Sequence, residues 1–204
     1  MKKIIYILLA IILITAITFL AIYIKTKLQA DALRFKTEYE ALNGEKSELT
    51  IPENNPIKYI DVKQAVEVLK NGSAIMYIGY PTCLACREAV PSVIEAAKQL
   101  NISKILYLNL KEYNNSFKVQ DGEVVKVREE AEGYYELLEA AKEITREYII
   151  REGEEHYEVG ESRIYSPTVL KIENGEITKF KTGASVTSDN EENGLVQEYI
   201  ELMK

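Results

Sequence analysis

Cys83-Leu84-Ala85-Cys86 is the stretch that decides the fold of this chain. The segment before it, residues 73–79, is short, apolar and bounded by glycines, which is typical of a buried strand. After a turn at residues 80–82, residues 87–100 carry apolar side chains at helical spacing. We therefore expect the cysteines at the junction of a strand and a helix, with Cys83 at the helix start.

This position predicts thiol chemistry. The thiolate is the nucleophilic form of cysteine, and the free N–H groups and dipole of a helix N-terminus favour it. Cys83 is therefore the candidate attacking thiolate. Cys86 lies one turn deeper on the same face, where it can close a disulfide with Cys83, and it is the candidate resolving thiol.

Two other interpretations of the cysteine pair stay open. The pair can be a structural disulfide or two buried thiols, although a loop this short constrains the unfolded chain little. Two such pairs can also share zinc across a dimer. Within one chain two cysteines supply only half of a tetrahedral zinc site, so the sequence indicates no metal site and no cofactor.

The ordered combination of strand, turn, C-x-x-C and helix resembles the thioredoxin superfamily. Pro91 lies five residues after the second cysteine, as in that family, and should kink the helix. Pro167 occupies the place of the family's cis-proline, at the opening of a late strand. The resemblance implies that Ser166 offers its backbone N–H and C=O to an extended substrate beside Cys83, and that Pro167 and Thr82 adjoin that substrate.

Within the superfamily, the chain is most similar to membrane-tethered thioredoxin-like proteins of Gram-positive bacteria, including bacteriocin transport accessory proteins. The resemblance covers roughly residue 55 to the C-terminus. Two positions depart from the family pattern. Thr82 stands where thioredoxins carry tryptophan, and Tyr77 stands where they carry a buried acid that helps to move the resolving thiol's proton.

The N-terminal residues 1–24 predict a membrane anchor. Residues 4–24 carry no charge, and as a helix they would span about 31 Å, enough for a hydrocarbon core. The alternative is a signal peptide cleaved after Ala32. Lys25 and Lys27, just beyond the apolar segment, count against cleavage and favour a stop signal that leaves the helix in the membrane. The positive-inside rule and the compartments in which disulfides persist together place the globular part outside the cytoplasm.

Residues 25–56 predict a helical stalk followed by a polar linker. An apolar stripe, which Asn43-Gly44 should end, follows a short heptad pattern. The stripe can pack on the domain, lie against lipid, or support a weak dimer. Its members are Leu28, Ala32, Phe35, Tyr39 and Leu42.

Residues 57–204 predict an α/β domain with a thioredoxin-like fold, a mixed sheet of four or five strands with helices on both faces. Asp61 should cap a helix, residues 57–60 and 104–110 should be strands, and residues 196–203 should be a closing helix. Strand, helix and strand around the cysteines then form a right-handed parallel crossover.

An insertion at about residues 113–164 separates the two halves of this domain. We expect a loop or hairpin around Asp121-Gly122, a helix over 129–148, and a second excursion at 149–164 that turns at Gly153 and Gly160. The expected buried side of the helix is Tyr135, Leu138, Ala141, Ile144 and Tyr148. The single histidine, His156, is expected on the surface among glutamates.

The insertion carries 14 acidic and 7 basic residues, so it holds all of the chain's net charge of −7. This excess is either a solvated face or a surface that selects a basic partner or repels anionic ones. Because acidic residues are in excess, the sequence gives no sign of the basic surface that nucleic-acid binding requires.

Together these features predict a membrane-anchored, extracytoplasmic thiol–disulfide oxidoreductase. It acts on protein or peptide thiols and disulfides and needs an electron partner; oxidation, reduction and isomerisation stay open. The alternative is a non-enzymatic accessory protein for the export or binding of a peptide such as a bacteriocin.

Overall fold

Five strands form one mixed sheet, in the order β1-β3-β2-β8-β9, in this computed structural model, which describes residues 2–185 and 194–204. Strands β1, β3 and β2 run parallel, and β8 and β9 continue the sheet antiparallel. Met1 of the predicted anchor and residues 186–193 of the predicted domain lie outside the described residues. The strands are β1 (Ile57–Tyr59), β2 (Ala74–Gly79), β3 (Ile105–Asn109), β8 (Thr168–Glu173) and β9 (Glu176–Thr182).

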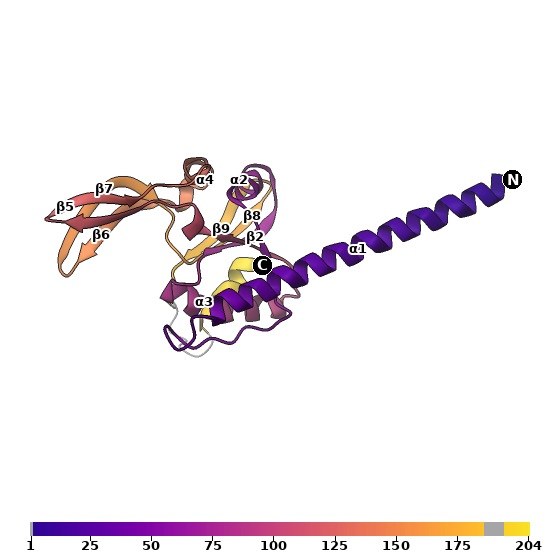
Figure 1. Ribbon diagram of the computed structural model, residues 1–204, viewed down its shortest axis with the longest axis horizontal. Coiled ribbons are helices and arrows are strands. Elements are labelled where there is room, and N and C mark those ends of the chain that lie inside the picture. The colour runs from indigo at the N-terminus through magenta and orange to yellow at the C-terminus, as the bar shows by residue number, and fades with distance from the viewer. Residues whose placement is uncertain (1, 186–193) are drawn as a thin grey trace.

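Both faces of this sheet are buried, because successive side chains of a strand point to opposite sides. In β2, Met76 and Ile78 join one core and Tyr77 joins the other. Figure 1 shows α2 and α4 over one face, and α3, α5 and the end of α1 over the other. The helices are α1 (Lys2–Glu40), α2 (Val62–Asn71), α3 (Leu84–Gln99), α4 (Tyr134–Ala140) and α5 (Gly194–Met203).

The α/β class, the mixed sheet and the helices on both of its faces are confirmed. The Asp61 prediction is also confirmed: its carboxylate accepts the N–H of Gln64, and the Gln64 side chain accepts the N–H of Asp61. The strand β2, the helix α3 and the strand β3 form the parallel crossover expected around the cysteines.

The N-terminal helix α1 runs unbroken through 39 residues. Within the described part of the chain, it is the one helix long and apolar enough to cross a membrane. Large apolar side chains such as Phe19 and Tyr23 are exposed on the part that projects from the domain. The prediction of a single N-terminal apolar helix is therefore confirmed for its length and its apolar composition.

The last turns of α1 lie inside the domain and do not form a separate stalk. Ala32, Phe35 and Tyr39, three members of the predicted stripe, are buried, and Phe35 and Tyr39 belong to the core between the sheet and α3. The Phe35 ring contacts four tyrosine rings, among them Tyr107 of β3 with centroids 4.9 Å apart. Packing on the domain therefore occupies the stripe, and a dimer through the same side chains would have to break that core.

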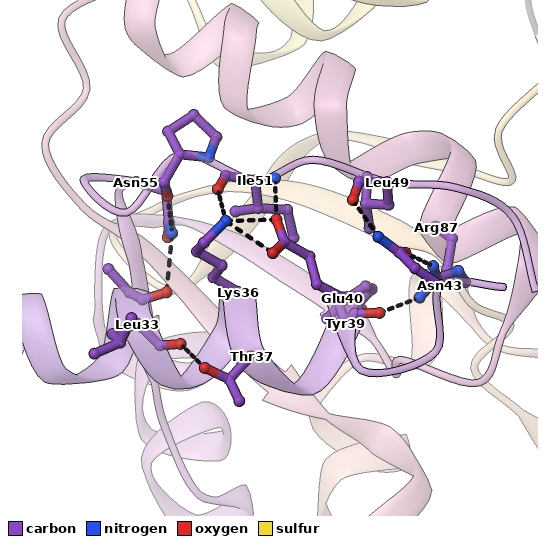
Figure 2. A network of polar contacts seen from close by, with 12 residues as sticks. Leu33, Lys36, Thr37, Tyr39, Glu40, Asn43, Leu49, Ile51, Asn55 and Arg87 are labelled. Carbon is purple, nitrogen blue, oxygen red and sulfur yellow. Dashed lines mark hydrogen bonds and ion pairs between the residues drawn. The ribbon is translucent and has the colours of Figure 1, made fainter.

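The segment after α1 is also attached to the domain, unlike a free linker. Leu49 and Ile51 are buried, and backbone and side-chain hydrogen bonds join this segment to α1, as Figure 2 shows. Lys36 Nζ donates to the Ile51 carbonyl at 2.8 Å, and Ile51 N–H donates to the Glu40 carboxylate at 2.7 Å. Residues 32–51 therefore contribute to the core that we expected to begin at residue 57.

The insertion consists of two hairpins with α4 and one short 3-10 turn, and a second 3-10 turn directly precedes it. The hairpin around Asp121-Gly122 is present, and a second hairpin turns at Gly153, while Gly160 lies within one of its strands. Both hairpins extend from the end of the domain opposite the free part of α1 (Figure 1). The elements are η1 (Leu110–Glu112), β4 (Ser116–Gln120), β5 (Glu123–Arg128), η2 (Lys142–Ile144), β6 (Arg146–Glu152) and β7 (Glu155–Arg163).

The predicted helix over residues 129–148 is wrong in length and in part of its buried side. Gly133, with φ of 89°, begins a helix of only seven residues that buries Tyr134 and Leu137 and exposes Tyr135. The run around Tyr148 is rich in β-branched and aromatic residues and pairs with β7 instead. A Cβ at position 133 would lie 2.7 Å from the Val62 side chain, so glycine also permits close packing on α2.

Candidate functional site

Cys83 is the N-cap residue of α3, where the strand β2 has turned into the helix. Its Sγ accepts the backbone N–H of Cys86 at 3.1 Å. A hydrogen bond from the Cys86 thiol, with backbone N–H groups of Cys86 and Ala85, lowers the pKa of Cys83 below its usual range, against the opposing effect of burial. Cys83 is partly exposed, so this stabilised thiolate is accessible to a partner.

Cys86 has the opposite environment. Its side chain is fully buried, and burial, followed by the hydrogen bond to the Cys83 sulfur, raises its pKa far above the usual range. Both cysteines are free thiols. The pair therefore combines one thiol that ionises readily with one that stays protonated. Because Cys86 is enclosed, its sulfur cannot reach a zinc ion shared with a second chain in this conformation.

The Ser166–Pro167 segment lies directly against the first cysteine. The peptide bond between them is cis, Pro167 is buried, and the Cys83 thiol donates to the Ser166 carbonyl with the two atoms 3.6 Å apart. These residues are 83 positions apart in sequence, and the pairing of β8 with β2 brings them together. The structure thus gathers Cys83, Cys86, Ser166 and Pro167 at one edge of the sheet.

Thr82 is exposed beside Cys83 and contacts the insertion side of the site. Its hydroxyl accepts a hydrogen bond from Lys111 Nζ at 3.0 Å. Lys111 follows strand β3, in the 3-10 turn η1. The sequence did not single out this lysine, and nothing in its local pattern predicts a contact across 29 residues.

Tyr77, the departure noted in the sequence, lies beneath Cys86. Its hydroxyl donates to the Cys86 carbonyl at 3.2 Å and lies 3.4 Å from the Tyr39 hydroxyl. A Cβ at Gly79 would lie 2.8 Å from the Tyr77 oxygen and 3.3 Å from the Cys86 sulfur. Glycine at this position therefore allows a phenol hydroxyl to come close to the buried thiol. Burial raises the pKa of Tyr77 well above its usual value, so this hydroxyl stays protonated.

Arg87, which follows the second cysteine, is a buried residue that the sequence analysis missed. It is 1 % exposed and donates to the Tyr39 carbonyl, to Asn43 and to Ser47, as Figure 2 shows in part. A cation at the C-terminal end of α1 meets carbonyl groups that the helix leaves unpaired. Its helical spacing could have indicated that it is buried, since Arg87 lies three residues before Val90 and so on the buried face of α3.

The geometry supports a two-step thiol exchange. The accessible thiolate can attack a disulfide, and the second thiol, hydrogen-bonded to the first sulfur, is close enough to attack the mixed disulfide that results. His156 is exposed on β7 and is not part of this arrangement. Comparison with models of known protein families and with curated proteins found no match to this chain.

Proposed function

We propose that this chain is a membrane-anchored thiol–disulfide oxidoreductase of the thioredoxin type, with its globular domain outside the cytoplasm. The observation that carries the proposal is the contrast between the two thiols, an accessible Cys83 with a lowered pKa and a buried Cys86 hydrogen-bonded to it. The contact between Cys83 and the Ser166 carbonyl supports a thioredoxin-like substrate position.

The proposed reaction is balanced by the two cysteines and the substrate disulfide. The Cys83 thiolate attacks one substrate sulfur, the substrate S–S bond breaks, and the other substrate sulfur leaves as a thiolate and takes up a proton. Cys86 then loses its proton and attacks the Cys83 sulfur, which releases the first substrate sulfur as a thiol. The substrate gains two electrons, and the cysteine pair becomes a disulfide. The reverse sequence oxidises a dithiol, and the electron partner's potential decides the direction.

Trapping with single-cysteine variants tests the proposal. In Cys86→Ser the attack remains but the release step is lost, so mixed disulfides with substrate proteins should accumulate in membranes and disappear with reductant. Cys83→Ser is the matched control and should trap nothing. The assignment of roles is wrong if Cys83→Ser traps substrate or if alkylation near neutral pH labels Cys86 before Cys83.

A non-enzymatic accessory role is the second candidate, and the two hairpins beside the cysteine pair favour it because they enlarge the surface available to a peptide. In this role the chain would hold or help to export a secreted peptide without thiol exchange. The double variant Cys83→Ser, Cys86→Ser in a deletion strain discriminates between the two roles. Full rescue of the deletion phenotype would support the accessory role and refute the redox proposal.

A further inference from the structure

A hollow of about 490 Å³ lies beside the cysteine pair, between the turn that precedes Cys83 and the hairpins of the insertion. Tyr80 and Thr82 line it on the side of the cysteines, and Tyr148 of β6 is among the residues from the insertion. We refer to it as the hairpin groove. Because Thr82 adjoins Cys83 in the chain, a substrate whose sulfur reaches Cys83 has neighbouring residues within reach of this groove.

The charge of the hairpin groove is opposite to that of the insertion, which supplies part of its lining. Its lining includes Lys111, Arg128 and Arg163 and no acidic residue, although the insertion as a whole carries the chain's entire negative excess. Within the described residues, none of these three side chains forms an ion pair with a carboxylate. Three cations without acidic partners therefore meet at one hollow.

Hydrogen bonds and ring contacts hold these cations in place. Arg128 donates to the Asn114 side chain at 2.6 Å and to the Lys111 carbonyl at 2.9 Å. The Arg163 guanidinium lies 3.9 Å from the centroid of the Tyr148 ring, and its buried Nε has no hydrogen-bond partner among the residues that the structure describes. The side-chain amide of Asn115, another lining residue, donates to the Glu161 carboxylate at 2.7 Å. Positioned cations of this kind lose less side-chain entropy when they bind an anion.

We propose that the hairpin groove binds a carboxylate group of the substrate, close to the cysteine that Cys83 attacks. This inference rests on the proposed function and adds a substrate class, thiols or disulfides with an acidic neighbour. A chain with net charge −7 and a reactive thiolate repels anionic substrates in general. Local cations offset that repulsion at the position where the substrate docks and also select against basic substrates.

Mixed-disulfide formation with short peptides tests the proposal on the full-length chain in detergent micelles, in the Cys86→Ser background. Each peptide carries one cysteine, activated as a disulfide with a chromophoric thiol, and a glutamate, glutamine or lysine two residues away, with both termini blocked. A fourth peptide carries glutamine and a free C-terminal carboxylate, which separates a side-chain acid from a chain end. At low salt the glutamate peptide should react about threefold to tenfold faster than the glutamine peptide, and the lysine peptide more slowly still.

Charge-neutralising variants locate the effect. Lys111→Gln, at an exposed position, should bring the ratio of the glutamate rate to the glutamine rate close to one, as should Arg163→Gln. Lys118→Gln is the matched control, because Lys118 is exposed on the same insertion outside the groove lining, and it should keep the full ratio. A ratio of one in the parent protein, or a ratio that Lys111→Gln leaves unchanged, overturns the inference while the redox proposal stands.

Alkylation separates the inference from the function on which it rests. If no peptide forms a mixed disulfide with Cys83, the proposed function fails, and the groove is tested by the relative rates at which anionic iodoacetate and neutral iodoacetamide label Cys83. The cations should raise the iodoacetate rate relative to the iodoacetamide rate, and Lys111→Gln should lower that ratio several-fold. An unchanged ratio overturns the inference in this assay as well.

Discussion

At the scale of single residues, burial has the largest effect on the pKa of Cys86, and the Tyr77 hydroxyl acts against it. Tyr77 is the polar side chain that lies against the buried thiol, and its hydrogen bonding lowers the pKa of Cys86 against the much larger effect of burial. A carboxylate in this place could accept the thiol's proton, whereas a phenol that itself stays protonated can stabilise the thiolate only by donating to it. The resolving step is therefore expected to be the slow step of the exchange.

Tyr77→Phe tests this role. Removing the hydroxyl should raise the pKa of Cys86 further and lengthen the lifetime of mixed disulfides, because a smaller fraction of Cys86 is then the attacking thiolate. The alkylation rate of Cys83 should stay within about twofold, because its thiolate is stabilised by Cys86 and backbone N–H groups. Stopped-flow measurement of the two steps with a small disulfide separates them. Equal slowing of both steps would indicate a general structural effect instead.

At the scale of elements, the end of α1 is held in the domain by an aromatic cluster. Tyr59, Tyr77 and Tyr107 form a row across three neighbouring parallel strands, in register. The Phe35 ring of α1 packs against all three, and Tyr39 packs beside it. Aromatic pairs at these separations add to the energy of burial itself.

Phe35→Ala should lower the free energy of unfolding by about 3–5 kcal/mol, because a fully buried ring is replaced by a cavity. Denaturant unfolding of the full-length chain in mild detergent measures this change. Leu33→Ala is the control on the same helix; Leu33 is 51 % exposed, and the change should stay within about 0.5 kcal/mol. A loss below 1 kcal/mol for Phe35→Ala would contradict the packing of α1 in the core.

The elements also show which parts of the fold could be predicted from sequence patterns. Short apolar strands, the Asp61 cap and the helix after Cys83 were predictable because each depends on local periodicity and capping. The stripe on α1 was equally visible, but a stripe does not say which apolar surface covers it. The helix expected over residues 129–148 was overpredicted because a glycine with positive φ and a β-rich run override the apolar spacing.

The same distinction applies to the candidate site. The cysteines and Ser166–Pro167 could be named from motifs, since the motif order itself carries the topology. The contacts of Thr82 with Lys111, and of Arg87 with Tyr39, join residues 29 and 48 positions apart. Such contacts depend on how the insertion and α1 pack, which local patterns do not encode.

At the scale of the whole molecule, buried tyrosines make the fold sensitive to alkali. Burial raises the pKa of Tyr77, Tyr107 and Tyr199, and it raises that of Tyr134 to about 12. In the unfolded chain tyrosines titrate near 10. Above that pH the unfolded state binds fewer protons than the native state, so the free energy of unfolding falls as the pH rises.

Each of these four tyrosines should contribute a loss of about 1.4 kcal/mol per pH unit, so together they lower the free energy of unfolding by about 5.5 kcal/mol per unit above pH 10. The contribution of Tyr134 should level off near its native pKa of about 12. Exposed tyrosines should ionise without unfolding, whereas phenolate absorbance from the buried tyrosines should rise together with the loss of far-ultraviolet circular dichroism. The chain has 14 tyrosines and no tryptophan, which keeps the absorbance simple. Ionisation of all the tyrosines near pH 10 without unfolding would contradict the burial of these rings.

Because α1 is one continuous helix, it fixes the distance between its apolar segment and the domain. With residues 4–24 in a bilayer, the 11 helical steps from Ile24 to Phe35 raise the aromatic cluster about 16 Å above the apolar segment. No hinge separates the two parts of this helix, so the height of Cys83 over the lipid surface is set by helical rise and tilt and not by a swinging tether. If the chain exchanges thiols as proposed, partner cysteines then have to arrive within one thin layer next to the bilayer, and cysteines exposed farther away stay out of reach.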